Sequence, residues 1–365
     1  MVHSLYDVVI IGAGPAGATL ARLVGAQRRV LLVDKRPSFD AAHGKCCGGL
    51  LAPDAQRLIS KLGLGLPRHI LVEPQIFVVR AIDLPRKLSC YYQRFYLNMD
   101  RPRFDAWLLS LVSPAVEVRL GCQLVSFSRQ KDHLTLTLRE EGGFRQVAAK
   151  LLVGADGAFS KVRRLAFPKR PGPNAYIAIQ EQVEAQEPLP YFSALFDPEI
   201  TDFYCWTIPK DDHLLIGAAL RPRAEAAARF GRLREKLREY GYRFGKVVRR
   251  EGAWIVRPRR FSDIITTGPG LTLVGEAAGF ISPSSAEGLS YAMRSALYLA
   301  EELNSSLEDI ERRYHRRTLS LRKNLFIKNL KSPFMFNPFL RRLIMQTGLN
   351  SLEMYRPPAP AKDEP

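Results

Sequence analysis

One stretch near the start of the chain constrains the fold more than any other. An apolar run at residues 7–11 leads directly into a glycine-rich turn at 12–17, and a helical segment follows at 18–26. A second apolar run at 30–33 ends at an acid, Asp34. Strand, G-x-G-x-x-G turn, helix, strand and acid at this spacing form the dinucleotide-binding fingerprint. The sequence therefore predicts a Rossmann-like α/β unit that binds a dinucleotide.

The three glycines of this turn have separate expected roles. Among Gly12, Gly14 and Gly17, one allows the tight turn, one lets the backbone approach a pyrophosphate, and one lets the helix pack on the strand. The helix that starts at Pro15 and Ala16 would direct its free N–H groups at the phosphates. These five residues, with Asp34 and Lys35, are the first predicted cofactor-binding set.

The overall charge narrows the possible partners. The 365 residues carry a net charge of +18, which favours anionic partners such as nucleic acid, lipid headgroups or a phosphorylated small molecule. Neither a nucleic-acid-binding module nor a zinc-ligand spacing is recognisable, so we expect no nucleic-acid partner and no metal. The sequence leaves the oligomeric state open.

Cysteine usage favours a reducing compartment. The five cysteines are odd in number and scattered, which speaks against a disulfide framework and for the cytoplasm. The first strand begins at about residue 7, which leaves no room for a signal peptide.

Two further glycine–acid steps follow buried strands. Asp156-Gly157 comes after an apolar run at 151–154, and Gly275-Glu276 comes after a run at 271–274. A loop between the second strand and the helix predicted at 54–62, which Asp54 would cap, contains Lys45, Cys46, Cys47, Gly48 and Gly49. Glycines this dense let backbone lie close to a flat ligand, and the alternative is a flexible surface loop.

The remaining chain alternates between strand and helix patterns. Period-two alternation predicts strands at 72–79, 88–97, 176–183, 191–196, 203–208 and 214–219, and helical patterns occur at 224–240, 289–304 and 308–342.

The order of these sites resembles the flavoprotein monooxygenases and reductases of the para-hydroxybenzoate hydroxylase fold, over roughly residues 5–300. The resemblance implies FAD, and it is bound non-covalently since no attachment site is recognisable. It implies that Arg101, ahead of a Phe-Asp-x-x-Leu helix, reaches the pyrophosphate side of the cofactor, and that Glu276 replaces the usual Asp. The cofactor-binding residues implied beyond the first set are Lys45, Cys46, Gly48, Gly49, Arg101, Leu124, Asp156, Gly157, Gly275, Glu276, Gly288 and Leu289.

Two motifs resemble the geranylgeranyl reductase branch of that group. These are Cys47-Gly48-Gly49 and the run Tyr204–Pro209, and residues 45–57 are similar to the CbrA-type subgroup. The second run also resembles a flavin-dependent halogenase signature, but Tyr204 and the Cys-Gly-Gly loop depart from that class. Alternating Tyr204, Trp206 and Ile208 are also typical of one face of a buried strand.

The resemblance implies a fold and its domains. We expect an α/β chain with an α+β insert, in which a Rossmann-like FAD-binding domain adjoins an antiparallel-sheet substrate domain and a C-terminal helical segment. The FAD-binding domain would comprise residues 1–72, 98–170 and 265–305, the substrate domain 73–97 and 171–264, the basic helices 306–350, and a disordered tail 351–365.

The implied activity is the reduction of carbon–carbon double bonds in an isoprenoid or other lipophilic substrate, by hydride transfer from reduced flavin. Cys47 is the predicted proton donor, and the alternatives for it are a small loop hydrophobe or a redox pair with Cys46. Tyr204, Trp206, Ile208 and Pro209 would line the substrate cavity. The sequence does not identify the electron donor, for which NAD(P)H and ferredoxin are the two candidates. A flavin monooxygenase, or a flavoprotein with a non-catalytic or electron-transfer role, remains the alternative function.

The C-terminal segment is basic and amphipathic. Residues 307–347 hold ten lysines and arginines and three acids, which suggests peripheral docking on an anionic membrane surface. An ordinary helix that closes the core is the alternative. The predicted interfacial residues are Leu325, Phe326, Ile327, Leu330, Phe334, Met335, Phe336, Phe339, Leu340 and Leu343.

Overall fold

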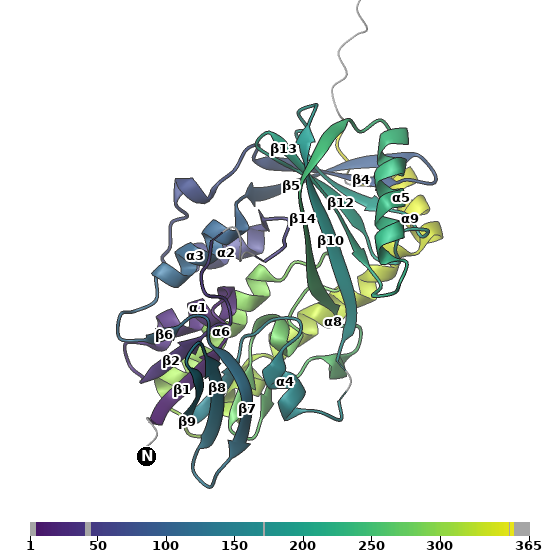
Figure 1. Ribbon diagram of the computed structural model, residues 1–365. Helices are drawn as coiled ribbons and strands as arrows, with labels where there is room; N and C mark the ends of the chain where they lie inside the picture. The colour runs from purple at the N-terminus through teal and green to yellow at the C-terminus, as the bar shows by residue number, and fades with distance from the viewer. Residues whose placement is uncertain (1–4, 41–44, 171, 350, 354–365) are drawn as a thin grey trace, which may run out of the picture.

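The strand, turn and helix of the fingerprint lie at the centre of a largely parallel sheet. In the computed structural model, which describes residues 5–40, 45–170, 172–349 and 351–353, this sheet has the order β15-β16-β9-β1-β2-β6, and a β7–β8 hairpin extends it from β9 (Figure 1). Its strands are β1 (Leu5–Ile11), β2 (Val30–Val33), β6 (Glu117–Arg119), β7 (Gln123–Arg129), β8 (Leu134–Glu140), β9 (Gly143–Gly154), β15 (Thr267–Gly268) and β16 (Leu271–Leu273).

Strand β1 is apolar on both faces because each face meets a separate core. Val8 and Ile10 pack toward α1 (Pro15–Val24) and α6 (Leu289–Ser305), whereas Val9 and Ile11 join a core with side chains of β8 and β9. A parallel strand that is covered on both faces typically has a continuous run of apolar residues in its sequence, as residues 7–11 do.

A second sheet is largely antiparallel and has the order β14-β10-β13-β12-β11-β4-β5-β3, in which only β11 and β4 pair in parallel (Figure 1). Its strands are β3 (Leu50–Leu51), β4 (Ile76–Asp83), β5 (Leu88–Asn98), β10 (Asn174–Ala185), β11 (Phe192–Phe196), β12 (Cys205–Lys210), β13 (His213–Leu220) and β14 (Phe244–Arg257).

The two faces of this sheet have different partners. Helix α5 (Ala226–Glu239) covers one face through Phe230, Leu233 and Leu237. On the other face, Trp206 and Ile208 form a separate apolar cluster. Because successive residues of a strand point to opposite faces, β12 presents alternate side chains to these two environments.

The remaining helices surround the sheets and form the end of the chain. They are α2 (Pro53–Lys61), α3 (Arg101–Ser110), α4 (Lys161–Ala166), α7 (Ile310–Arg317), α8 (Leu319–Phe336) and α9 (Pro338–Thr347). None of the helices in the described ranges has the length and apolar content that crossing a bilayer requires.

Several local predictions need correction. Helix α2 begins at Pro53, so Ala52 and not Asp54 is its cap, and Asp54 accepts a hydrogen bond from Ser290 Oγ at 2.8 Å instead. The strand predicted at 72–79 lies at Ile76–Asp83. Leu50–Leu51 pairs with β5, so residues inside the predicted FAD-binding range 1–72 belong to the second sheet. The predicted tail lies mostly at 354–365, outside the described residues.

The helix predicted at 308–342 is three helices. Thr318 separates α7 from α8, and Asn337 caps α9 by accepting hydrogen bonds from the N–H groups of Phe339 and Leu340. A side-chain cap followed by Pro338 at the first helical position explains the break, because both features start a new helix.

These C-terminal helices connect the two sheets. The Tyr314 hydroxyl of α7 donates to the Leu273 carbonyl of the first sheet at 3.0 Å. Arg341 of α9 donates through Nε to Asp83 of β4 at 2.9 Å, and the Asp83 side chain is fully buried. The position of α9 against the second sheet therefore depends on a buried ion pair.

We expect Arg341→Met to lower the free energy of unfolding by about 3 kcal/mol, because it leaves Asp83 buried with only Arg86 at 3.4 Å. Urea unfolding followed by circular dichroism measures this, with Arg342→Met at the exposed neighbouring position as the control. Equal unfolding curves for the two variants would contradict the structural role of the pair.

Candidate functional site

A cavity of about 1090 Å³ lies between the carboxyl ends of the parallel strands and the inner face of the second sheet. Ile11, Val33 and Ala155, at the ends of β1 and β2 and just after β9, line one part of it. Ligands of open α/β sheets bind at this edge, and the volume exceeds the range of about 300–1,000 Å³ for ordinary small-molecule sites. The cavity therefore has room for a large cofactor and a second ligand.

The glycines of the fingerprint divide their roles along the cavity wall. Gly12 has a φ of +105°, and a Cβ there would lie 2.5 Å from the Ala155 carbonyl oxygen. A Cβ on Gly17 would overlap the Gly12 carbonyl, so Gly17 allows α1 to pack against the turn. A Cβ on Gly14 would meet no protein atom within 4 Å, because it would project into the cavity that Gly14 lines. Only Gly14 is therefore explained by a ligand that approaches the backbone.

Two helices begin at the cavity. Gly14 precedes α1 and Gly288 precedes α6, and neither cap provides a side-chain hydrogen bond to the first turn. Pro15, Ala16 and Leu289 line the cavity beside them. Free N–H groups and the helix dipole favour negative charge at both places, as phosphates and electron-rich carbonyl groups require.

Asp34 is held as a carboxylate at the end of β2. Its Oδ2 accepts from the Ala13 N–H at 2.7 Å and from Arg36 Nη2 at 2.9 Å, and Oδ1 accepts from Arg36 Nε at 3.0 Å. Burial would raise the pKa of Asp34, but the hydrogen bonds and charge of Arg36 outweigh it and hold the pKa below its ordinary value. The sequence predicted Asp34 and missed Arg36.

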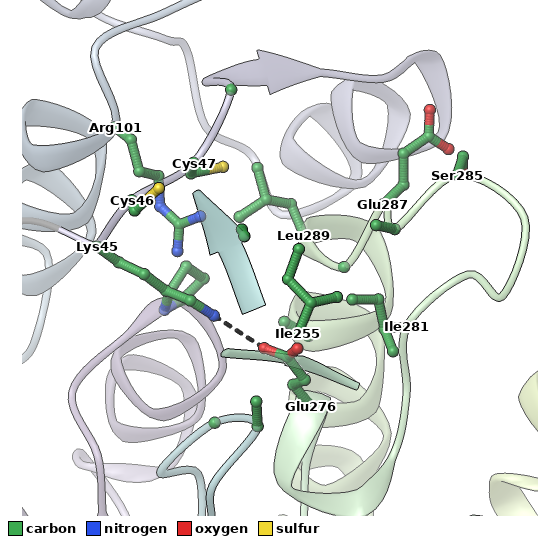
Figure 2. A pocket seen from close by; sticks show the side chains of 18 of the residues that line it. Lys45, Cys46, Cys47, Arg101, Ile255, Glu276, Ile281, Ser285, Glu287 and Leu289 are labelled. Atoms are coloured by element: carbon green, nitrogen blue, oxygen red, sulfur yellow. Dashed lines mark hydrogen bonds and ion pairs between the residues drawn. The ribbon is translucent and has the colours of Figure 1, made fainter. Parts of the chain in front are cut away.

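Arg101 lies beside Cys47, and its Nε donates to Asp105 Oδ1 at 2.7 Å (Figure 2). Burial alone would raise the pKa of Cys47. The charge of Arg101, the Gly49 N–H and Lys45 outweigh that effect and lower it. Cys46 is in the opposite condition, since burial raises the pKa of its thiol to about 12. Both thiols are free, and only Cys47 has surroundings that stabilise a thiolate.

The glycines of the Cys-Gly-Gly loop pack closely against other parts of the protein. A Cβ on Gly48 would lie 2.5 Å from Ile208 Cδ1, and Gly49, at a φ of +61°, lies against the Met99 carbonyl. Both residues also line the cavity, so the approach of a flat ligand to their backbone stays a prediction beside this packing role. His43 and Gly44 of the loop lie outside the described residues.

Lys210, which sequence reasoning missed, fixes this loop from β12. Its Nζ donates to the Gly49 carbonyl at 3.1 Å and to the Met99 carbonyl at 2.8 Å. Burial lowers the pKa of Lys210 to about 7. The only sequence signal available was its position at the end of the Tyr204–Pro209 strand.

Lys45 and Glu276 meet across the cavity. Lys45 Nζ lies 2.8 Å from Glu276 Oε2, as the dashed line in Figure 2 shows, and Glu276 Oε1 accepts from the Val256 N–H at 3.3 Å. Both residues were predicted to bind the cofactor, and the structure brings them together. A cofactor hydroxyl near Glu276 would share this carboxylate with Lys45.

Asp156 lines the cavity and also bonds to the start of α4. Its carboxylate accepts from Ser160 Oγ and, at 2.6 Å, from the Lys161 N–H, while Ser160 is the N-cap of α4 and accepts from the Arg163 N–H. Burial raises the pKa of Asp156. Gly157, at a φ of +77°, continues the cavity wall beside it.

Most of the predicted residues line this one cavity, and three do not. Gly17 packs inside, Gly275 packs against Ala16 and Ala292, and Pro209 lies on the opposite face of β12 from Ile208. Strand alternation is the physical reason why Pro209 does not line the cavity beside Ile208, and its role as a substrate contact stays a prediction. The predicted residues that do line the cavity are Gly12, Gly14, Pro15, Ala16, Asp34, Lys35, Lys45, Cys46, Cys47, Gly48, Gly49, Arg101, Leu124, Asp156, Gly157, Tyr204, Trp206, Ile208, Glu276, Gly288 and Leu289.

The half of the cavity on the second sheet is mainly apolar. Trp206 Nε1 donates to Gln180 Oε1 at 3.0 Å, and the Tyr204 hydroxyl donates to the Ser285 carbonyl at 2.7 Å. Both rings therefore face the cavity with their polar atoms already paired. Further apolar lining residues, which the sequence did not predict, are Val79, Ala81, Phe192, Ala194, Phe196 and Ile344.

One polar cluster interrupts this apolar wall. Glu287, labelled at the cavity edge in Figure 2, accepts from the Tyr96 hydroxyl at 2.7 Å and pairs with Arg94 at 2.9 Å. Burial, followed by the charge of Glu287, raises the pKa of Tyr96 well above its ordinary value. These residues were missed because Glu287 is far from the other two in sequence.

Comparison with known proteins agrees with a flavin site. A family model described as an FAD binding domain matches residues 5–229. Protein CbrA of Escherichia coli O6:H1 is 40% identical over 345 residues, 94% of each chain. A geranylgeranyl bacteriochlorophyll reductase-like protein of Thermoplasma acidophilum superposes with a TM-score of 0.74 at 19% identity, over 94% of this chain and 99% of that one. PqsL of P. aeruginosa, in complex with 2-aminobenzoylacetate, gives 0.71 at 18%, over 95% and 100%.

Two glycine variants separate ligand binding from packing. We expect Gly14→Ala to keep the thermal stability of the protein without flavin while weakening FAD binding at least tenfold, because the methyl group enters only the cavity. Gly17→Ala should lower that stability itself, because its methyl group meets the Gly12 backbone. Flavin fluorescence titration and thermal melting measure the two effects, and unchanged FAD affinity in Gly14→Ala would contradict the cofactor placement.

Proposed function

The chain belongs to the family of FAD-binding-domain flavoproteins, and on this premise we propose that it reduces carbon–carbon double bonds of an isoprenoid or similarly lipophilic substrate. The observation that best supports this proposal is that the cavity is continuous. One half contains the fingerprint and two helix N-termini, and the other half is walled by apolar side chains of the second sheet.

The second half favours a lipophilic ligand over a polar one. The hydroxyl groups of Tyr204 and Tyr96 and the indole N–H of Trp206 are all directed to protein acceptors. A ligand there meets mainly ring faces and aliphatic groups, and burial of such surfaces is worth about 25 cal/mol per Å². The wall also keeps water from the reacting carbons.

The chain must supply a proton for this reaction. When bound, reduced FAD supplies the hydride that one alkene carbon receives. We propose that Cys47 Sγ gives the proton to the other carbon and is left as a thiolate. Arg101 and the Gly49 N–H stabilise this thiolate, which makes Cys47 a stronger acid than an ordinary thiol. Solvent then returns the proton to Sγ.

This role predicts a pH dependence. Only the thiol form of Cys47 donates, so the reduction rate should be highest below the Cys47 pKa and fall as the pH rises through it, and that pKa lies below the ordinary value. Single-turnover rates of the reduced protein measure the profile. Cys47→Ala should slow the step by 10²-fold or more, at the lower end of general-acid contributions, and remove that limb of the profile. An unchanged rate in Cys47→Ala would overturn the donor role.

Trp206 tests the substrate half of the cavity. We expect Trp206→Ala to raise the KM for substrate about tenfold or more while FAD remains bound, because the ring forms part of the wall away from the fingerprint. Trp206→Phe keeps a ring at that position and serves as the matched control. Loss of FAD in Trp206→Ala would show that the ring is structural.

The chemical outcome decides between function classes. The reduced protein is incubated without oxygen with a polyprenol, and the product is analysed by mass spectrometry. A product with two added hydrogen atoms supports the reductase. Oxygen insertion in air with NADPH would instead identify a monooxygenase, and no product under either condition would favour an electron-transfer role. Parallel incubations with NAD(P)H or reduced ferredoxin identify the electron donor, for which we propose these two classes.

A further inference from the structure

The last two helices expose an unusual number of large apolar side chains. Leu330 is 60% exposed and Phe339 is 65% exposed. Contiguous apolar surface of this kind marks an interaction site in a folded protein. We define the α8–α9 face as the exposed residues Phe326, Ile327, Leu330, Phe334, Met335, Phe339 and Leu343.

The helical spacing places these side chains together. Phe326, Leu330 and Phe334 are four residues apart along α8, so they form one stripe. Phe339 and Leu343 repeat the spacing on α9, which packs against α8. Three residues predicted to join this face do not. Leu325 is buried in the core of the first sheet, Phe336 packs at 5.2 Å from Phe203, and Leu340 is half-buried.

The segment that contains the α8–α9 face has basic side chains and no acidic ones. No Asp or Glu occurs between residues 312 and 352. Lys323, Lys331 and Arg342 are exposed on the same two helices, and within the described ranges none of them forms an ion pair with a carboxylate. An apolar helix face flanked by free cations is typical of helices that lie in the headgroup region of anionic membranes.

The α8–α9 face is continuous with the cavity. Phe334 and Met335 line the cavity and are also 50% and 38% exposed. Their neighbour Phe336 is held against the second sheet, with the Arg257 guanidinium 4.3 Å from its ring centre. The side chains of Phe334 and Met335 therefore connect the apolar lining of the cavity to the apolar surface.

We propose that the α8–α9 face docks on an anionic lipid bilayer and that a lipophilic substrate passes from the bilayer into the cavity between Phe334 and Met335. Docking stands on the surface alone, whereas the passage of substrate rests on the proposed function. A second copy of the chain is a poorer occupant, because a two-fold interface would set this cationic, acid-free face against itself.

Vesicle sedimentation tests docking without any reaction. The FAD-loaded protein is mixed with vesicles of phosphatidylcholine alone or in equal mixture with phosphatidylglycerol. We expect binding to the mixed vesicles that decreases with added salt. Lys323→Gln, Lys331→Gln and Arg342→Gln should each weaken binding about fivefold.

The apolar contribution is tested with a matched pair of variants. Ile327→Ser, Leu330→Ser and Phe339→Ser together should weaken vesicle binding at least tenfold, and none of these residues lines the cavity. The control variant carries Phe144→Ser on β9 and Val248→Ser on β14, two exposed apolar positions outside the α8–α9 face. It should bind vesicles as the unchanged protein does.

Three results would overturn docking: no binding to either vesicle, binding by the triple serine variant equal to that of the unchanged protein, or a solution dimer that the triple variant dissociates while vesicles do not bind. The passage of substrate has its own readout. The triple variant should reduce detergent-dispersed polyprenol normally and vesicle-embedded polyprenol more slowly. Vesicle binding with no reduction of either form would overturn the proposed function and leave docking intact.

Discussion

The arrangement depends on the contact between Gly17 and the backbone of Gly12. Because no side chain separates them, α1 begins directly at the end of β1, and its N-terminus faces the cavity. Helix α1 also packs against α6, whose own start at Gly288 forms a second edge of the cavity. Two helix N-termini thus lie around a single space. This is the arrangement that a cofactor with phosphates and electron-rich carbonyl groups requires.

The second sheet adds a different chemistry to that space. Lys210 fixes the Cys-Gly-Gly loop to β12 through two backbone carbonyls, so Cys47 is held where the cofactor half and the apolar half of the cavity meet. Arg101, at the start of α3, lowers the pKa of Cys47 against the effect of burial. The C-terminal helices close the far end, where Arg341 fixes α9 on β4. The dinucleotide fingerprint, the Cys47 thiol and the apolar half of the cavity are thus positioned by different parts of the fold.

The sequence predicted features whose signal is local. The fingerprint was recognisable because strand, turn, helix and acid are contiguous, and the family resemblance added Arg101 and Glu276. The pairing of Glu287 with Arg94 and Tyr96 was not predictable, because these residues meet only when the sheets come together. The motif placed Asp156 at the cavity, which it lines, but did not reveal that its carboxylate also bonds to the start of α4. Leu325 shows the limit of helical periodicity, which finds an apolar face without revealing what covers it.

We propose that one cavity holds FAD and a lipophilic alkene in contact. The most direct test of this proposal is the visible absorption of the flavin after the reduced protein is mixed, without oxygen, with a polyprenol. We predict that the absorption of oxidised FAD returns as the alkene is reduced, and that Trp206→Ala slows this return more than Trp206→Phe. A flavin that stays reduced until oxygen is admitted, with polyprenol present throughout, would contradict the account.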